Sequence, residues 1–445
     1  MEIIDNTTRD SHGNEREDNV SKTDDHIHQD SDDIPLLNSI REMTARLPSL
    51  SNGCSIYRVP KRLREMNEKA YTPQVFSIGP FHRGKEQLQA MEEHKLRYLQ
   101  SFLNRTGISL NNCIRVVKEW EERARSYYEE MIRLSSDEFA KMTLLDGCFI
   151  IEVIWRSKFS SEESKQTDYL NRIMEVNDVC KDMIILENQL PFFVLEGLFN
   201  LAFPLSERPD SFLMLSIWYL VNYGFVGNIK PSFPSSEVKH FVDLLRLCHL
   251  PSSLRPLLPP AMVKDVPIHN ATELNEAGIK FKNGSSNRLL DITYAMGVLE
   301  IPQLSVFDVT ESLLRNLVAL EQIHYPSDTY ITDYILFMDS LIDTNKDVDL
   351  LVQNGVLANN LGDSSEVAGL FNSLSKEVFI ISDEKYYFYR VSEELNEYWK
   401  DPWHKWKATL KRDYFSTPWR TASTIAAIIL LVLTLIQTIC SIIDL

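Results

Sequence analysis

The last stretch of the chain, Thr421 to Ile443, constrains the fold most strongly because it is apolar along its whole length. It contains no Asp, Glu, Lys, Arg, His, Gly or Pro, and its few polar side chains, Thr, Ser and Gln437, can bond along or between helices. As an α-helix its 23 residues measure about 35 Å, which exceeds the roughly 30 Å of hydrocarbon in a bilayer. A buried core helix would carry a polar stripe, so the sequence predicts one transmembrane helix over 421–443.

Basic and aromatic residues gather just before this stretch, as they do at a membrane–water boundary. The predicted membrane collar consists of Trp403, Trp406, Lys411, Arg412, Trp419 and Arg420. Residues 1–20 contain no apolar run that could act as a cleavable signal. We therefore expect a single-pass, tail-anchored protein at the plasma membrane or an endomembrane, with its bulk in the cytosol.

The composition is that of a globular protein with a solvated tail. Of 445 residues, 44% are apolar and 24% are charged, which suits one large or two ordinary domains. The net charge of −17 argues against a nucleic-acid partner, because phosphates require a basic surface. Residues 1–33 hold eleven acids, three bases and no aromatic residue, so we predict a disordered acidic tail there. The six cysteines form no CxxC pair, and we predict no metal site.

Residues 34–415 are expected to form one mainly helical domain. Helices are predicted over 34–50, 88–105, 112–134, 139–155, 182–203, 311–324, 330–343, 346–358, 364–378 and 391–410. The segment 139–155 is almost wholly apolar and predicts a central buried helix, and 182–203 resembles it. The predicted fold class is thus mainly α (α+β): a large helical domain, a small β element and one C-terminal transmembrane helix.

A change of pattern separates two parts of this domain. Five prolines fall within 250–267, which indicates a lobe boundary or a long surface loop. The segments 279–282 and 289–307 then alternate and carry β-branched residues, with Asn283-Gly284 as a hairpin signal. We expect a small antiparallel sheet here.

One stretch imitates a phosphate-binding loop. Gly79 to Lys85 matches G-x-x-x-x-G-K, but Glu86 stands where a Ser or Thr should hold magnesium. Pro80 also lacks one of the N–H groups that would cradle phosphates. The sequence therefore predicts no nucleotide and no other cofactor.

Three acids in apolar segments have two readings. Asp146, Glu152 and Glu187 would be costly to bury unless they were paired or hydrogen-bonded. They could form a general acid/base pair, or they could bond helix ends and neighbours such as Asn188 and Gln189. The chain shows no G-x-S-x-G nucleophile motif and no His at metal-ligand spacing, so a structural role is favoured. We assign no catalytic, cofactor-binding or metal residue.

Several phrases together resemble a plant family called domain of unknown function 247. They are Ile56–Pro60, Tyr71–Pro73, Ser77–His82, Met91-Glu92, Leu145–Cys148, Leu186–Pro191, Asp308–Ser312, Arg315-Asn316, Glu321-Gln322 and Trp419–Ser423. The resemblance runs in order from about Ile56 to the C-terminus. The polar motif residues singled out for a structural role are Asp146, Glu187, Asn188, Gln189, Glu311 and Arg315.

The resemblance implies a plant protein with a C-terminal span and no established reaction or cofactor. Some grass members of the family are linked to self-incompatibility, and the family is often drawn with its domain outside the cell, against the orientation expected above. We predict a membrane-tethered interaction protein that binds protein partners, including copies of itself. The alternative is a membrane-anchored hydrolase using Asp146, Glu187 and a histidine such as His82. Transport is disfavoured, because one span lined with Thr, Ser and Gln makes no pore.

Overall fold

The chain divides into two compact units in the computed structural model, which describes residues 34–45, 53–160, 177–203, 210–252, 268–378, 386–414 and 417–443. The first unit, Met1–Ser49, contributes one described element, α1 (Ile34–Ala45), within the helix predicted over 34–50. All other elements belong to the second unit, Leu50–Leu445. The predicted tail, 1–33, lies outside the described residues, as does 253–267 of the predicted boundary, so both stay predictions.

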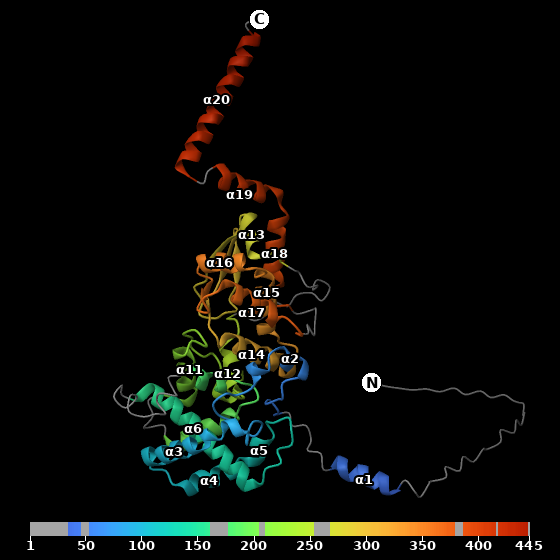
Figure 1. The fold of residues 1–445 in the computed structure, drawn as a ribbon, viewed down its shortest axis with the longest axis vertical. Helices are drawn as coiled ribbons and strands as arrows, with labels where there is room; N and C mark the ends of the chain where they lie inside the picture. The colour runs from blue at the N-terminus through green and yellow to red at the C-terminus, as the bar shows by residue number, and fades with distance from the viewer. Residues whose placement is uncertain are drawn as a thin grey trace, which may run out of the picture. The chain divides into compact units, whose positions relative to one another are not determined.

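The first part of the second unit is built around one long buried helix. Its elements are α2 (Lys61–Met66), η1 (Glu68–Tyr71), η2 (Glu86–Leu88), α3 (Ala90–Thr106), α4 (Leu110–Glu119), α5 (Glu121–Arg125), α6 (Ser136–Phe159), α9 (Asn177–Met183), α10 (Phe192–Ala202) and α11 (Phe212–Asn222). A capping box between Ser135 and Glu138 starts α6, and every residue from Met142 to Ile154 is buried. Helices α3, α4, α10 and α11 pack against it (Figure 1), which confirms the central helix predicted at 139–155.

The second part centres on α14 (Thr310–His324), in which every residue from Ser312 to Gln322 is buried. Its other elements are η3 (Ser235–Glu237), α12 (Phe241–His249), α13 (Ala271–Glu276), β1 (Lys280–Asn283), β2 (Thr293–Ala295), β3 (Val298–Ile301), β4 (Leu304–Val306), α15 (Tyr330–Leu341), α16 (Asn345–Gln353), β5 (Leu357–Asn359), α17 (Ser364–Leu374) and α18 (Tyr389–Lys400). Helices α12, α15 and α17 contact α14. The mainly helical fold with small sheets is thus confirmed.

The strands differ from the expected antiparallel sheet. Among the described strands, β2 and β3 pair antiparallel, whereas β1 pairs with β3 and β4 pairs with β5 in parallel. Asn283-Gly284 makes no hairpin, because Asn283 is opposite Ile301 and the Gly284 N–H donates to the Ile301 carbonyl at 2.9 Å. The tight turn falls instead at Met296-Gly297, between β2 and β3, where both residues have positive φ. The Asn-Gly signal failed because a two-residue turn also needs partner strands on both sides.

Four predicted helices are interrupted where tertiary contacts or special residues intervene. The one at 112–134 ends at Arg125, because the Tyr127 carbonyl accepts both the Ser55 and Ile56 N–H groups at 2.9 Å. The one at 182–203 is broken at 184–191 by a turn before Pro191. The one at 346–358 gives α16 and β5 on either side of Gly355, and the one at 391–410 breaks before Pro402.

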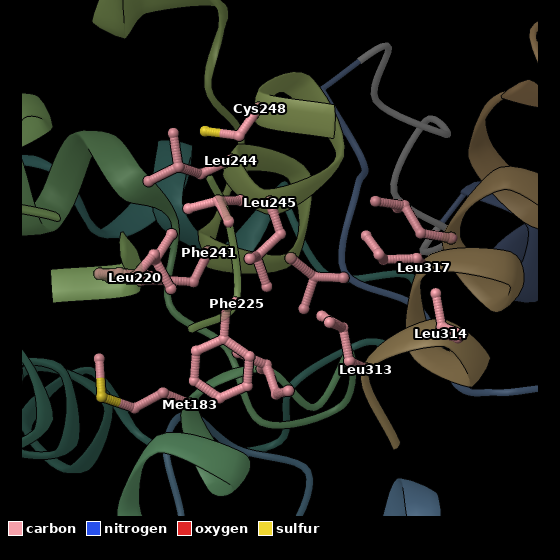
Figure 2. Packing of buried hydrophobic residues seen from close by; sticks show 14 of the residues in the cluster. Met183, Leu220, Phe225, Phe241, Leu244, Leu245, Cys248, Leu313, Leu314 and Leu317 are labelled. Carbon is pink, nitrogen blue, oxygen red and sulfur yellow. The ribbon is translucent and has the colours of Figure 1, made fainter. Parts of the chain in front are cut away.

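A continuous apolar core joins the two parts of this unit. Its buried side chains run from Ile56 to Leu395, and Figure 2 shows the stretch where α12 faces α14. In Figure 2, Leu245 of α12 lies on the side that faces Leu313 and Leu317 of α14, whereas Leu244 and Cys248 point to the other side of α12. Because all of these side chains are buried, this contact ties residues about seventy positions apart into one body.

The C-terminal helices expose their large apolar side chains, whereas the core of the body buries them. Two further helices follow α18, namely α19 (Pro402–Tyr414) and α20 (Pro418–Ile443). The stretch Pro418–Cys440 contains an 18-residue window with a mean hydropathy of 2.3, and none of that window is buried. The described part of the chain therefore has one exposed C-terminal helix that is long and apolar enough to cross a membrane, where 421–443 was predicted.

Candidate functional site

The turn between α9 and α10 is the most polar part of the interior. Glu187, Asn188 and Gln189 are at most 2% exposed. The Asn188 Oδ1 accepts from the Ile78 N–H at 2.6 Å, and its amide donates to the carbonyls of Phe76 and Asp182. We call Asp146, Asp182, Glu187, Asn188 and Gln189 the polar junction, because each binds backbone from another segment.

Gln189 ties two more pieces of chain to this turn. Its amide donates to the carbonyls of Met183 and Ile185, at 2.7 and 2.8 Å, and its Oε1 accepts from the Phe241 N–H at 2.9 Å. Gly79 passes so close that a Cβ there would lie 2.5 Å from the Gln189 carbonyl oxygen, and its φ is +67°. Only glycine fits both constraints.

Glu187 is surrounded by donors. Its Oε1 accepts from the Val59 N–H at 2.7 Å and contacts Arg64, and its Oε2 lies 3.2 Å from Arg58 Nη1. Burial alone would raise the pKa of Glu187, but the adjacent His82 ring, the Val59 N–H and Arg64 outweigh it and hold the pKa at about 2. Glu187 is therefore an ionised carboxylate whose oxygens are already engaged.

His82 is the histidine of the hydrolase hypothesis. It is 2% exposed, and its Nε2 lies 3.3 Å from Glu187 Oε2 without hydrogen-bond alignment. Burial lowers the pKa of His82, against the pull of Glu187, so the ring is neutral at pH 7. The positive charge beside Glu187 therefore comes from Arg58 and Arg64.

Asp146 of α6 belongs to a second cluster, which binds the backbone near Gly79. Its Oδ1 lies 2.6 Å from the Lys95 Nζ, and its Oδ2 accepts from the Gly79 N–H at 2.9 Å. The burial of Lys95 acts to lower its pKa, but Asp146 and Glu92 outweigh that effect and raise it, so the ammonium stays charged. Burial also raises the pKa of Asp146, and Lys95 opposes that rise. We assign an ionised pair, because both the ammonium and the Gly79 N–H stabilise the carboxylate.

Asp182 holds three successive backbone groups. Its oxygens accept from the N–H groups of Gln74, Val75 and Phe76 at 2.8, 2.6 and 3.0 Å. Burial raises the pKa of Asp182 to about 6, although these hydrogen bonds act to lower it. Sequence reasoning missed Asp182 and Lys95 as members of the site, because neither sits in a recognisable motif.

The other singled-out residues lie in separate pairs. The Glu311 carboxylate and the Arg315 guanidinium form an ion pair at 2.8 Å on α14. The Asn67 amide donates to Glu311, and Arg315 donates to the Ser373 hydroxyl. The third buried acid, Glu152, contacts Arg105 and Arg156 instead. Within the described residues, no group of three His, Cys, Asp or Glu side chains has the arrangement of a metal site.

Two surface pockets adjoin the polar junction. The larger, about 580 Å³, is lined by Arg58, Pro80, Phe81, Glu130, Met131, Ile132, Arg133 and Leu134. The smaller, about 260 Å³, is lined by Ser77, Arg83, Gly84, Lys85, Leu88, Gln89 and Glu92. Neither lining includes Asp146, Glu187 or His82, so these pockets do not bring the acids and the histidine to an open surface.

The collar residues lie on the last two helices. Trp403 and Trp406 are exposed on α19, and Trp419 and Arg420 are exposed on α20. The backbones of Lys411 and Arg412 belong to α19, but their side chains lie outside what the structure describes.

The described chain is a helical body followed by one exposed apolar helix. The side chains of the polar junction, inside the body, bind its own backbone. This arrangement is typical of proteins that have a globular domain and a single candidate membrane-spanning helix. Residues 56–433 match the family DUF247, described as plant protein of unknown function, and the chain belongs to that family. The resemblance seen in the sequence is thereby confirmed.

Two Arabidopsis thaliana proteins are similar along most of the chain. UPF0481 protein At3g47200 is 30% identical over 410 residues, which cover 86% of this chain and 85% of the relative. Putative UPF0481 protein At3g02645 is 23% identical over 478 residues, which cover 86% and 89%. No solved structure matches the chain.

Proposed function

We propose that this chain is a membrane-tethered recognition protein: α20 spans a bilayer, and the helical body binds protein partners at the cytosolic surface. The plasma membrane or an endomembrane is its location, and the body catalyses no reaction. Tethering confines the body and its partners to a thin layer, which raises their effective concentration without new contacts.

The main support for this proposal is the chemistry of α20. Its apolar side chains are exposed, from Ile425 at 48% to Ile442 at 69%, and water would have to cover them all. Its threonine hydroxyls donate within the helix, as when Thr434 bonds the Leu430 carbonyl and Thr438 bonds the Thr434 carbonyl at 2.8 Å. A helix whose threonine hydroxyls bond its own backbone suits hydrocarbon, and lipid is the medium that removes this apolar surface from water.

The polar junction supports recognition over catalysis. A general base needs a free oxygen within reach of a substrate, whereas Glu187 and Asp146 bind arginine, lysine and backbone donors. The depressed pKa of Glu187, about 2, also makes it a poor base at neutral pH. We therefore assign these acids to holding the segments together, so that the outer surface of the body is left to bind.

The orientation follows from charge. Residues 402–420 carry five basic residues and one acid, which suits the cytosolic side of a span. Protease treatment of sealed microsomes carrying the full chain tests it. We expect digestion of the body and survival of a short fragment containing α20. A body that stays intact until detergent is added would contradict the cytosolic orientation.

Partner binding needs its own test. A proximity-labelling enzyme fused before Met1 should label a reproducible set of proteins that a chain carrying only residues 402–445 does not label. Identical labelling by both chains would mean that the body adds no recognition, and it would contradict the proposal.

A further inference from the structure

Helix α19 has an aromatic face. At about 100° per residue, positions 403, 406, 410 and 414 fall on one side of the helix. Trp403, Trp406 and Tyr414 are 61%, 55% and 53% exposed, and the two Trp rings lie 5.1 Å apart. Large amphipathic rings displayed side by side are costly in water and settle readily among lipid headgroups.

The charge around this face is complementary to an anionic surface. Residues 402–420 contain Lys405, Lys407, Lys411, Arg412 and Arg420 against Asp413, a formal charge of +4 in a chain of −17. Lys407 is exposed and lies four positions after Trp403, which places it at the edge of the aromatic face. Each basic residue near an anionic leaflet adds to the attraction between α19 and the membrane.

The helix is held at the start of the apolar span. Asp401 accepts from the Trp403 N–H at 2.9 Å, which begins α19 at Pro402. At the far end, the Thr424 hydroxyl of α20 donates to the Tyr414 carbonyl at 3.2 Å. If α20 crosses the bilayer, Tyr414 must therefore lie near the membrane boundary.

A second exposed apolar group lies beside the last turn of α18. Met296 is 100% exposed at the tip of the β2–β3 hairpin with φ +49°, a conformation rare for methionine. The next residue, Gly297, faces Tyr398, because a Cβ there would lie 3.4 Å from the Tyr398 hydroxyl. Trp399 stacks on His269 at 3.6 Å, which fixes α18 to the body just before α19 begins.

We propose that α19 and the hairpin tip form a lipid-binding platform: α19 lies flat in the headgroup layer with its aromatic face toward the hydrocarbon, and Met296 touches the same surface. Its ligand is a bilayer surface with anionic lipid. The platform rests on the proposed tether, and it adds that the body is seated on the membrane in one orientation. Charge complementarity and the continuity of α19 with α20 favour a bilayer over a second copy of the chain.

Quenching of tryptophan fluorescence tests whether α19 lies in the headgroup layer. The full chain is placed in vesicles of phosphatidylcholine with or without 30% phosphatidylserine, using lipids brominated at acyl positions 6,7 or 11,12. The 6,7-brominated lipid should quench the wild-type chain more strongly than the variant W403F/W406F, and the difference should grow with phosphatidylserine. The control W218F, which removes a Trp on α11, should not reduce quenching. Equal quenching of wild type and W403F/W406F would overturn the platform.

An environment-sensitive label tests the hairpin. In a C54S/C440S background, Met296→Cys carrying NBD should shift its emission to the blue in anionic vesicles. The matched control is Met131→Cys, at a methionine that is 58% exposed after α5, and it should not shift. No shift at 296, or quenching that depends on protein concentration instead of lipid charge, would contradict the platform.

Carbonate washing of the same vesicles separates the two proposals. Retention of a chain that shows no quenching difference would leave the tether standing and remove the platform. Release of the chain would remove both.

Discussion

The polar junction buries polar side chains, whereas α20 exposes apolar ones. Both arrangements cost free energy, and the two regions differ in what offsets that cost. The junction buries charges and amides, yet each named side chain has partners within the body, such as Lys95 for Asp146 and the Val59 N–H for Glu187. Helix α20 exposes apolar side chains, and none of the other described segments covers them. A buried charge is stabilised by the fold itself, whereas an exposed apolar helix is stabilised by another medium.

This difference separates two kinds of variant. Changes in the junction should alter the free energy of unfolding and leave membrane retention intact. Changes in α20 should alter retention and leave the stability of the body intact.

Charges in the middle of α20 should have the largest effect. Each arginine at the centre of a span costs roughly 2.5–3.5 kcal/mol, so the variant L431R/L435R should lose about 6 kcal/mol of insertion free energy. We expect the chain to move from the membrane pellet to the soluble or aggregated fraction, with the circular-dichroism melting midpoint of the body unchanged. Full retention of this variant would contradict a spanning role.

Asp146→Ala should unfold the body or nearly so. It leaves the Lys95 ammonium buried without its main partner, and breaking a buried pair in this way costs about 3–5 kcal/mol. Urea unfolding measures the loss. The control is Asp137→Ala, which removes an exposed partner of Lys118 and should not shift the midpoint measurably. An Asp146→Ala chain that folds normally but loses an activity would favour the hydrolase instead.

Acid should weaken the body in a defined window. Burial lowers the pKa of His240 to about 3 and of His249 to about 4, so below their unfolded values, near pH 6.5, the unfolded state binds more protons. Glu187, with a pKa of about 2, adds a loss as pH falls below 4.5. Asp182, with a raised pKa of about 6, opposes this trend, as do Asp146, Asp243, Asp339 and Glu321, whose pKa values are also raised by burial. The lowered pKa values of His82 and His324 act with those of His240 and His249, and the lowered pKa values of Glu311 and Asp347 act with that of Glu187, so the destabilising groups are more numerous.

The free energy of unfolding should therefore fall steadily from pH 6.5 downward, and urea titrations between pH 7.5 and 4 measure it. A flat or rising stability over that range would show that these groups do not have the environments described.

Thr434→Val should have the smallest effect. The Thr434 hydroxyl donates only to the Leu430 carbonyl, one turn back in the same helix, so its loss leaves no donor unpaired. We expect unchanged carbonate resistance and an unchanged melting midpoint. Release of this variant would mean that α20 depends on a polar contact with another helix, and the account of a self-sufficient span would be wrong.

Much of the fold could be predicted because its signals are local. The apolar runs at 139–155 and 421–443 are long, and their helices formed where expected. The breaks were missed because they depend on distant partners: the carbonyl of Tyr127 bonds the N–H groups of Ser55 and Ile56 instead of continuing a helix. No sequence pattern within 112–134 reports that contact.

For the same reason, only some residues of the polar junction could be predicted from the sequence. Glu187 and Asp146 stood out as acids in apolar surroundings, and the need for partners followed from the cost of burial. Which partners they take could not be predicted, since Lys95 lies on α3 and Val59 lies more than a hundred residues before Glu187. Parallel pairing of β1 with β3 was likewise set by topology and not by the turn residues.

Whether α20 anchors the chain in a bilayer is decided by carbonate extraction of membranes that carry the intact chain, beside a chain that ends at Thr417. We expect the intact chain to stay in the pellet at pH 11 and the shortened chain to be soluble with the same melting midpoint. Release of the intact chain by carbonate, or a shortened chain that cannot fold, would contradict this expectation.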